Sequence, residues 1–325
     1  MKTTIKIFLI LSMVAISCEK ADDFLTAPPL GKFSDDAVWK DPALVQTFIN
    51  SMYRSAFGFP HSLIRLSSYV DESRFTHDWG LASSNQCLIT SDNLFGWTAG
   101  KHTSNLRWDP QYSLVRMTNI LFSKIDEVPG EEATINKLKG EAYFMRAWTY
   151  FNLTNLYGGV PLITKAYTLN DNFEVARNTY EECINFIVGQ CDSSALYLPD
   201  VYPTDGHVSK GAALALKARV LLYAASDLHN PAKTGVVTSG FSNPELLGYK
   251  GGDATARWTA ARNAAKAVID LGKYSLFRSN PAPGDSVAQN FVDYFLSKQS
   301  TSEDILLLYF TSKTNESWDG YNPGL

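Results

Sequence analysis

Hydrophobic and small side chains recur at helical spacing through the stretch GEAYFMRAWTYFNLTNLYGGVPLI, residues 140–163. A helix that is apolar on two faces must pack against neighbours on two sides. Gly158 and Gly159 can adopt the left-handed conformation that ends a helix, and Pro161 prevents the helix from continuing. The stretch therefore predicts a buried helix over about 131–157 with a sharp end. Its two faces are expected to carry Leu138, Ala142, Met145 and Thr149 on one side, and Phe144, Trp148, Phe151 and Asn155 on the other.

Similar spacing predicts five further helices. Asp41 is expected to cap the first of them with Pro42 at its first position, and Thr179 with Glu182 has the form of a capping box. Gly272 is expected to end the last helix. The five ranges are about 42–56, 108–128, 179–194, 210–225 and 257–271.

Taken in chain order, the six helices form three pairs, about 42–128, 131–194 and 210–271, and the remainder is expected to be loops. Helix pairs with small residues at their packing points are typical of tetratricopeptide units. The pattern therefore favours a mainly all-α fold of tetratricopeptide-like pairs in a right-handed superhelix, with long irregular loops that carry the ligand site. The usual period of about 34 residues is not visible, so a generic helical bundle remains the alternative.

The N-terminus has the features of an export signal. Lys2 and Lys6 precede an apolar run at 7–16 that is too short to span a bilayer. The small residues before Cys18 resemble a bacterial lipobox, in which the cysteine is acylated and becomes the mature N-terminus. We expect a lipoprotein signal peptide at 1–17, an acylated Cys18 and tether at 18–36, and a folded domain at 37–325. Ordinary cleavage with an incidental Cys18 is the alternative.

Composition narrows the classes of function. With 45% hydrophobic and 19% charged residues the chain has a globular composition, and its net charge of −4 argues against a nucleic-acid partner. The five histidines and four cysteines show no metal-ligand spacing, so we expect no metal, no cofactor and free thiols at Cys87, Cys183 and Cys191. No catalytic motif is present, and Asp71 with Glu72 could form a glycosidase pair only at a separation that sequence does not reveal. The chain is not expected to be an enzyme.

Several segments resemble one family along most of the chain. They are the stretch 140–163, AVWKD at 37–41, WDPQY at 108–112, VSKGAALALKARVLLYAAS at 208–226 and SEDIL at 302–306, which resembles a strand. Together they resemble the SusD/RagB family, the surface nutrient-binding lipoproteins of Gram-negative bacteria. The resemblance implies a protein held on the cell outer membrane by lipid on Cys18, facing outward over a SusC-like TonB-dependent transporter. Family members are usually longer, so the chain is expected to lack the family's C-terminal part.

The resemblance implies binding of oligo- or polysaccharides and their delivery to the transporter. The alternative is a peptide-binding or protein-docking lid of tetratricopeptide type. Flat aromatic rings can stack on a pyranose while carboxylate, amide and guanidinium groups bond its hydroxyls. On that basis the ligand is expected in the loop 66–107 and in the last loop, with Trp39, Trp108, Trp148 and Trp258 in the core. The predicted ligand residues are Asp71, Arg74, Trp79, Asn85, Trp97, Trp318 and Tyr321.

Overall fold

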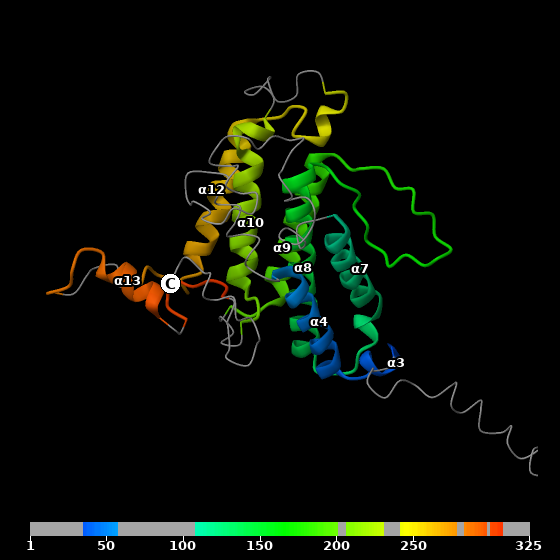
Figure 1. Cartoon of the computed structure of the whole chain (residues 1–325), viewed down its shortest axis with the longest axis horizontal. Helices are drawn as coiled ribbons and strands as arrows, with labels where there is room; N and C mark the ends of the chain where they lie inside the picture. The colour runs from blue at the N-terminus through cyan, green and yellow to red at the C-terminus, as the bar shows by residue number, and fades with distance from the viewer. Residues whose placement is uncertain are drawn as a thin grey trace, which may run out of the picture.

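The fold is all-α and tetratricopeptide-like (Figure 1). The computed structural model describes residues 35–57, 108–200, 206–230, 241–277, 283–297 and 300–307, and no strand occurs among these residues. Its helices are α3 (Asp35–Val38), α4 (Pro42–Phe57), α7 (Trp108–Lys124), α8 (Glu132–Tyr157), α9 (Tyr180–Tyr197), α10 (Lys210–Ala225), α12 (Ala254–Asp270) and α13 (Gln289–Leu296). Three short 3-10 turns join them: η3 (Ile125–Glu127), η4 (Asp227–His229) and η5 (Pro244–Leu246).

The long helices begin where local chemistry predicts. Thr179 and Glu182 form the capping box, in which the Glu182 amide donates to Thr179 Oγ1 (3.2 Å) and the Thr179 amide donates to Glu182 Oε2 (2.8 Å). α12 starts three residues earlier than expected, because Asp253 caps it by accepting from the Thr255 amide at 2.8 Å. The pattern-based prediction of these helices is confirmed.

Helix α8 lies at the centre and packs against α4, α7 and α9. Leu138, Ala142, Met145 and Phe144 are buried on its two faces as predicted, whereas Asn155 is exposed. At its end, Gly158 has a φ of +72° and its amide donates to the carbonyl of Thr154 at 2.9 Å. A Cβ at this position would lie 2.1 Å from the carbonyl oxygen of Leu246, so the sharp stop requires glycine.

The pairs α8/α9 and α10/α12 are the closest neighbours, as the chain order predicts. The first pair differs, because α4 packs more extensively on α8 than on α7. The segment 58–107 between α4 and α7 is long enough to let α4 pack on a helix other than its neighbour in the chain. Helix α4 is therefore placed by its apolar face, which buries Val45, Ile49 and Met52.

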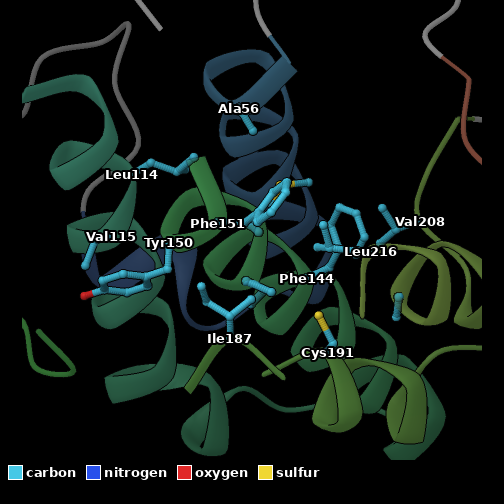
Figure 2. Packing of buried hydrophobic residues seen from close by; sticks show 14 of the residues in the cluster. Ala56, Leu114, Val115, Phe144, Tyr150, Phe151, Ile187, Cys191, Val208 and Leu216 are labelled. Carbon is cyan, nitrogen blue, oxygen red and sulfur yellow. The ribbon is translucent and has the colours of Figure 1, made fainter. Parts of the chain in front are cut away.

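The core fills the space between these helices (Figure 2). Cys183 and Cys191 are buried free thiols, as predicted, and burial raises the pKa of Cys191 to about 12. Trp39 is buried, and Trp108 and Trp148 pack against the core.

Two expectations about the C-terminal half are wrong. Trp258 is 43% exposed, because α12 turns Ala261 and Ala264 toward α10 and leaves its opposite face uncovered. Residues 302–306 form a turn instead of a strand, since the Asp304 carboxylate accepts from the Thr301 amide at 2.6 Å and its hydroxyl at 2.9 Å.

Candidate functional site

All of the ligand and lipid positions predicted from sequence lie outside the described residues. They are Cys18, Asp71, Arg74, Trp79, Asn85, Trp97, Trp318 and Tyr321, and Cys87 lies outside as well. The expected signal peptide, and the tether up to residue 34, also fall outside. These assignments therefore stay predictions.

Within the described residues, the most distinctive surface feature is the connection between α8 and α9. Figure 1 shows it as a long excursion away from the helices, between the end of α8 and the start of α9. We call residues 163–177 of this connection the projecting loop. Three sets of contacts hold it in one shape.

The first set of contacts is at the base of the loop. The Arg177 guanidinium donates to the carbonyls of Tyr157 and Gly159. These bonds hold the last residue of the loop against the end of α8. The Tyr150 hydroxyl accepts from the Ile163 amide at 2.7 Å and donates to the Ile163 carbonyl at 3.1 Å. Burial raises the pKa of Tyr150 well above its ordinary value, so this hydroxyl keeps its proton.

The second set reaches the loop from α7. Asn119 Nδ2 donates to the carbonyls of Ile163 and Lys165, each at 3.0 Å, and Arg116 donates to the Tyr167 carbonyl. Arg146 of α8 in turn holds Asn119, since its Nη2 donates to Asn119 Oδ1 at 2.9 Å.

Arg146 is itself a buried cation. It is 6% exposed, its Nε donates to Thr118 Oγ1 at 3.3 Å, and its guanidinium carbon lies 4.1 Å from the centroid of the Phe122 ring. Burial lowers the pKa of Arg146 to about 10, which still leaves it charged at neutral pH. The charge therefore makes a strong hydrogen bond to Asn119 and orients its amide toward the loop.

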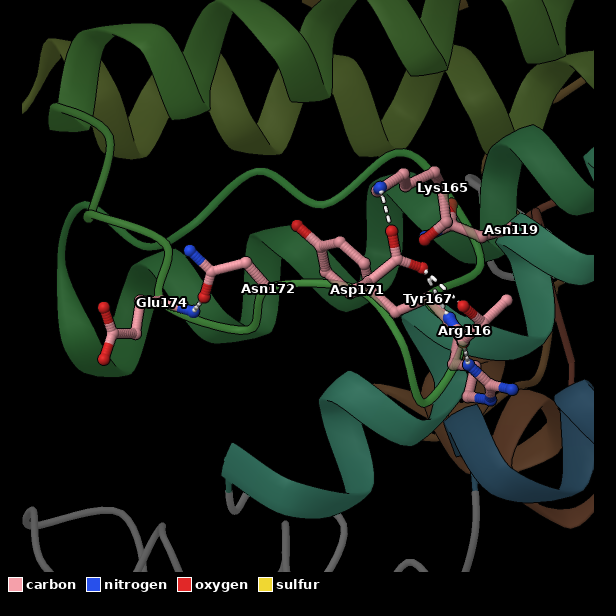
Figure 3. A network of polar contacts seen from close by, with 8 residues as sticks. Arg116, Asn119, Lys165, Tyr167, Asp171, Asn172 and Glu174 are labelled. Carbon is pink, nitrogen blue, oxygen red and sulfur yellow. Dashed lines mark hydrogen bonds and ion pairs between the residues drawn. The ribbon is translucent and has the colours of Figure 1, made fainter.

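The third set lies within the loop (Figure 3). Asp171 accepts from Lys165 Nζ at 2.5 Å, from the Thr168 amide at 2.7 Å and from the Thr168 hydroxyl at 3.0 Å. These bonds, the one from Lys165 first, hold the pKa of Asp171 at about 2. Asn172 Oδ1 accepts from the Glu174 amide at 2.9 Å. These bonds within the loop add to the contacts from α7 and α8 that fix its shape.

Among the exposed side chains of the loop, which include polar ones, three large apolar residues stand out. Leu169 is 98% exposed, Phe173 is 62% exposed and Val175 is 37% exposed. The rings of Tyr167 and Phe173 have centroids 5.5 Å apart, and Lys165 Nζ lies 4.8 Å from the Tyr167 centroid. Such an arrangement can make contact with another molecule, whereas it offers no nucleophile or metal-ligand set. Across the described ranges, no group of three or more histidine, cysteine or acidic side chains could hold a metal ion.

Sequence reasoning did not select the projecting loop. Its segment ITKAYTLNDNFEVAR has no helical or strand period, and its anchoring groups Asn119 and Arg146 are on other elements. The available signal was local: Leu169 and Phe173 are isolated apolar residues between polar ones, outside any periodic stretch.

A second cluster surrounds a fully buried carboxylate, Glu141 of α8. Gln46 of α4 donates to Glu141 Oε2 at 3.2 Å, and Oε1 lies 3.7 Å from Lys137 Nζ and 3.6 Å from His207 Nδ1. Burial raises the pKa of Glu141, and His207, Lys137, Gln46 and Tyr53 oppose that rise without cancelling it. The cluster joins α4, α8 and the segment that leads into α10.

None of the helices in the described part of the chain has the length and apolarity needed to cross a membrane. Residues 29–222 match the model of a SusD-like family described as starch-binding and associating with the outer membrane. The chain is 30% identical over 243 residues to SusD-like protein P38 of Formosa agariphila, an alignment that covers 71% of this chain and 45% of that protein.

Solved structures share the fold. A SusD-like protein from Bacteroides fragilis NCTC 9343 is similar with a TM-score of 0.54 and 25% identity, over 78% of this chain and 43% of that one. A SusD superfamily protein from Bacteroides thetaiotaomicron VPI-5482 is similar with a TM-score of 0.55 and 21% identity, over 83% of this chain and 53% of that one. The chain thus spans about half the length of these relatives or less. Because the family model matches more than half of its residues, the chain belongs to the SusD-like family.

Proposed function

We propose that this protein captures glycans at the cell surface and delivers them to a partner TonB-dependent outer-membrane transporter. The observation that carries the proposal is the match of residues 29–222 to a family described as starch-binding and associating with the outer membrane. The activity is binding without catalysis, and it uses no metal and no cofactor.

The protein is held at the outer membrane by its N-terminus. In this proposal a signal peptide at 1–17 directs export, Cys18 carries the lipid, and residues 18–36 tether the domain 37–325 outside the cell. A tether of this length lets the domain lie over the transporter while it stays attached.

The sugar is proposed to stack on Trp79 and Trp97, with Asp71, Arg74 and Asn85 bonding its hydroxyls. Trp318 and Tyr321 form the second candidate contact. In the sequence, the segment that holds the first group comes after α4, which is fixed to α8 by its apolar face and by the bond from Gln46 to Glu141.

Affinity electrophoresis of the soluble chain, starting after Cys18, tests the proposal. The protein is run through gels that contain starch or one of a panel of plant and host polysaccharides. Retardation by at least one polysaccharide is expected and identifies the substrate class. A folded protein that no polysaccharide retards would contradict glycan capture and favour the peptide-binding or protein-docking lid.

The site is tested in the same gels with Trp97→Ala, which is expected to lose most of the retardation while its melting curve is unchanged. The matched control is Trp258→Ala, an exposed tryptophan of α12 that is not among the predicted ligand residues. Normal retardation of Trp97→Ala, or equal loss in the control, would remove Trp97 from the proposed site.

A further inference from the structure

The projecting loop has the properties of a protein-docking element. We propose that its tip, formed by Leu169, Phe173 and Glu174, inserts into an apolar pocket with a cationic rim on the outer face of the partner transporter. The inference rests on the proposed function, which supplies the transporter. It assigns the contact to a part of the molecule distinct from the predicted sugar residues.

Several polar groups of the loop are bonded within the protein. Lys165 is paired with Asp171, Asp171 also accepts from Thr168, and Arg177 donates to backbone carbonyls at the base. Asn172 uses its side-chain oxygen on the Glu174 amide. A glycan site needs polar groups that converge on the ligand, and here they converge on the loop itself.

The loop presents large apolar side chains to its surroundings. Leu169 is 98% exposed and Phe173 is 62% exposed, and both belong to a connection that Figure 1 shows running out from the helices. Aliphatic side chains such as that of Leu169 supply no ring for a sugar to stack on. Exposed apolar groups at a protruding position instead fit the anchor residues of a protein interface, which fill pockets on the partner.

The loop is also held in one shape before any partner binds. Tyr150 and Arg177 fix its base. Asn119 and Arg116 of α7 hold its backbone, and Lys165 pairs with Asp171 inside it (Figure 3). A segment already held in its bound shape loses little conformational entropy on binding. The protein therefore holds an apolar tip in place before any partner arrives.

The charges of the loop predict the chemistry of the pocket on the partner. Lys165 and Asp171 neutralise each other, and the Arg177 guanidinium is turned to the base. Glu174 is exposed, and across the described ranges no cation pairs with its carboxylate. A complementary pocket is therefore apolar where it receives Leu169 and Phe173, and carries lysine or arginine opposite Glu174.

The test is quantitative copurification of the transporter with the full lipidated chain from its native bacterium, with the transporter identified by mass spectrometry. The double variant Leu169→Ala, Phe173→Ala is expected to recover at least about tenfold less transporter than the wild type, as the loss of two anchor residues predicts. Glu174→Lys is expected to weaken recovery more than Glu174→Gln. The matched control is Ile269→Ala, which removes a 77% exposed side chain on α12 and is expected to change nothing.

The possible results separate failure of the inference from failure of the proposed function. If the wild type copurifies the transporter and the loop variants retain it, the inference is overturned while the proposed function stands. If the wild type recovers no transporter, delivery and the inference fail together. Loop variants that keep the transporter but lose polysaccharide retardation would show that the loop contacts glycan. A photo-crosslinker at position 169 that joins two copies of the chain would show that the loop contacts a second copy. Either result overturns the inference.

Discussion

The hydroxyl of Tyr150 links the buried helix α8 to the projecting loop, and Tyr150→Phe removes only that oxygen. The amide of Ile163 then loses its acceptor, which lies at 2.7 Å, whereas the Ile163 carbonyl keeps its bond from Asn119. A buried donor without a partner costs about 1–3 kcal/mol. Because Ile163 is only partly buried, water can reach it in part, so the expected loss is about 1–2 kcal/mol in the free energy of unfolding.

Urea unfolding at equilibrium measures this loss, and amide hydrogen exchange locates it. Protection of the Ile163 amide is expected to fall sharply in Tyr150→Phe, with smaller losses toward Tyr167. Tyr143→Phe is the matched control, since it deletes a hydroxyl from the same helix at a partly exposed position. A change below about 0.5 kcal/mol, or unchanged protection at Ile163, would refute the reasoning, because surface substitutions already vary by that amount.

Two further predictions concern stability. Burial raises the folded pKa of Glu141, so the folded protein holds this proton more tightly than the unfolded chain does, and the stabilisation from the proton is lost as pH rises through the folded pKa. The free energy of unfolding of the wild type relative to Glu141→Gln is therefore expected to grow as pH falls from above the folded pKa toward the ordinary glutamate pKa. A pH-independent difference in urea unfolding would contradict this. Gly158→Ala puts an alanine at a positive φ, with its Cβ 2.1 Å from the Leu246 carbonyl oxygen. We therefore expect the free energy of unfolding in urea to fall by about 2–4 kcal/mol, and a fall under about 1 kcal/mol would show that the strain is absent.

The helices could be predicted from sequence because their signals are local. The capping box at Thr179, the Gly158 stop and the two apolar faces of α8 each depend on residues a few positions apart. Such features survive in any tertiary arrangement that buries α8 on both sides.

Features that depend on neighbours far along the chain were not predictable in the same way. The orientation of Trp258 depends on which face of α12 meets α10, and the small residues Ala261 and Ala264 decide it. A helix at the end of a row of packed pairs has only one covered side, so an apolar period alone does not say which side that is.

The projecting loop is the clearest case. Its shape comes from Asn119, Arg146 and Tyr150, which precede the loop on two different helices. Arg146 orients Asn119, and Asn119 holds the loop. Such contacts between distant residues produce no periodic pattern in the sequence. Only the assembled structure shows that Lys165 pairs with Asp171 inside the loop (Figure 3) while Leu169 and Phe173 remain exposed.

Glycan capture is the central claim, and isothermal titration calorimetry tests it most directly. The soluble chain, starting after Cys18, is titrated with oligosaccharides made from starch and from the other polysaccharides of the panel. We predict saturable binding of at least one oligosaccharide with a stoichiometry near one per chain, lost in Trp97→Ala and kept in Trp258→Ala. A folded chain that gives no saturable heat with any of these oligosaccharides would contradict the account.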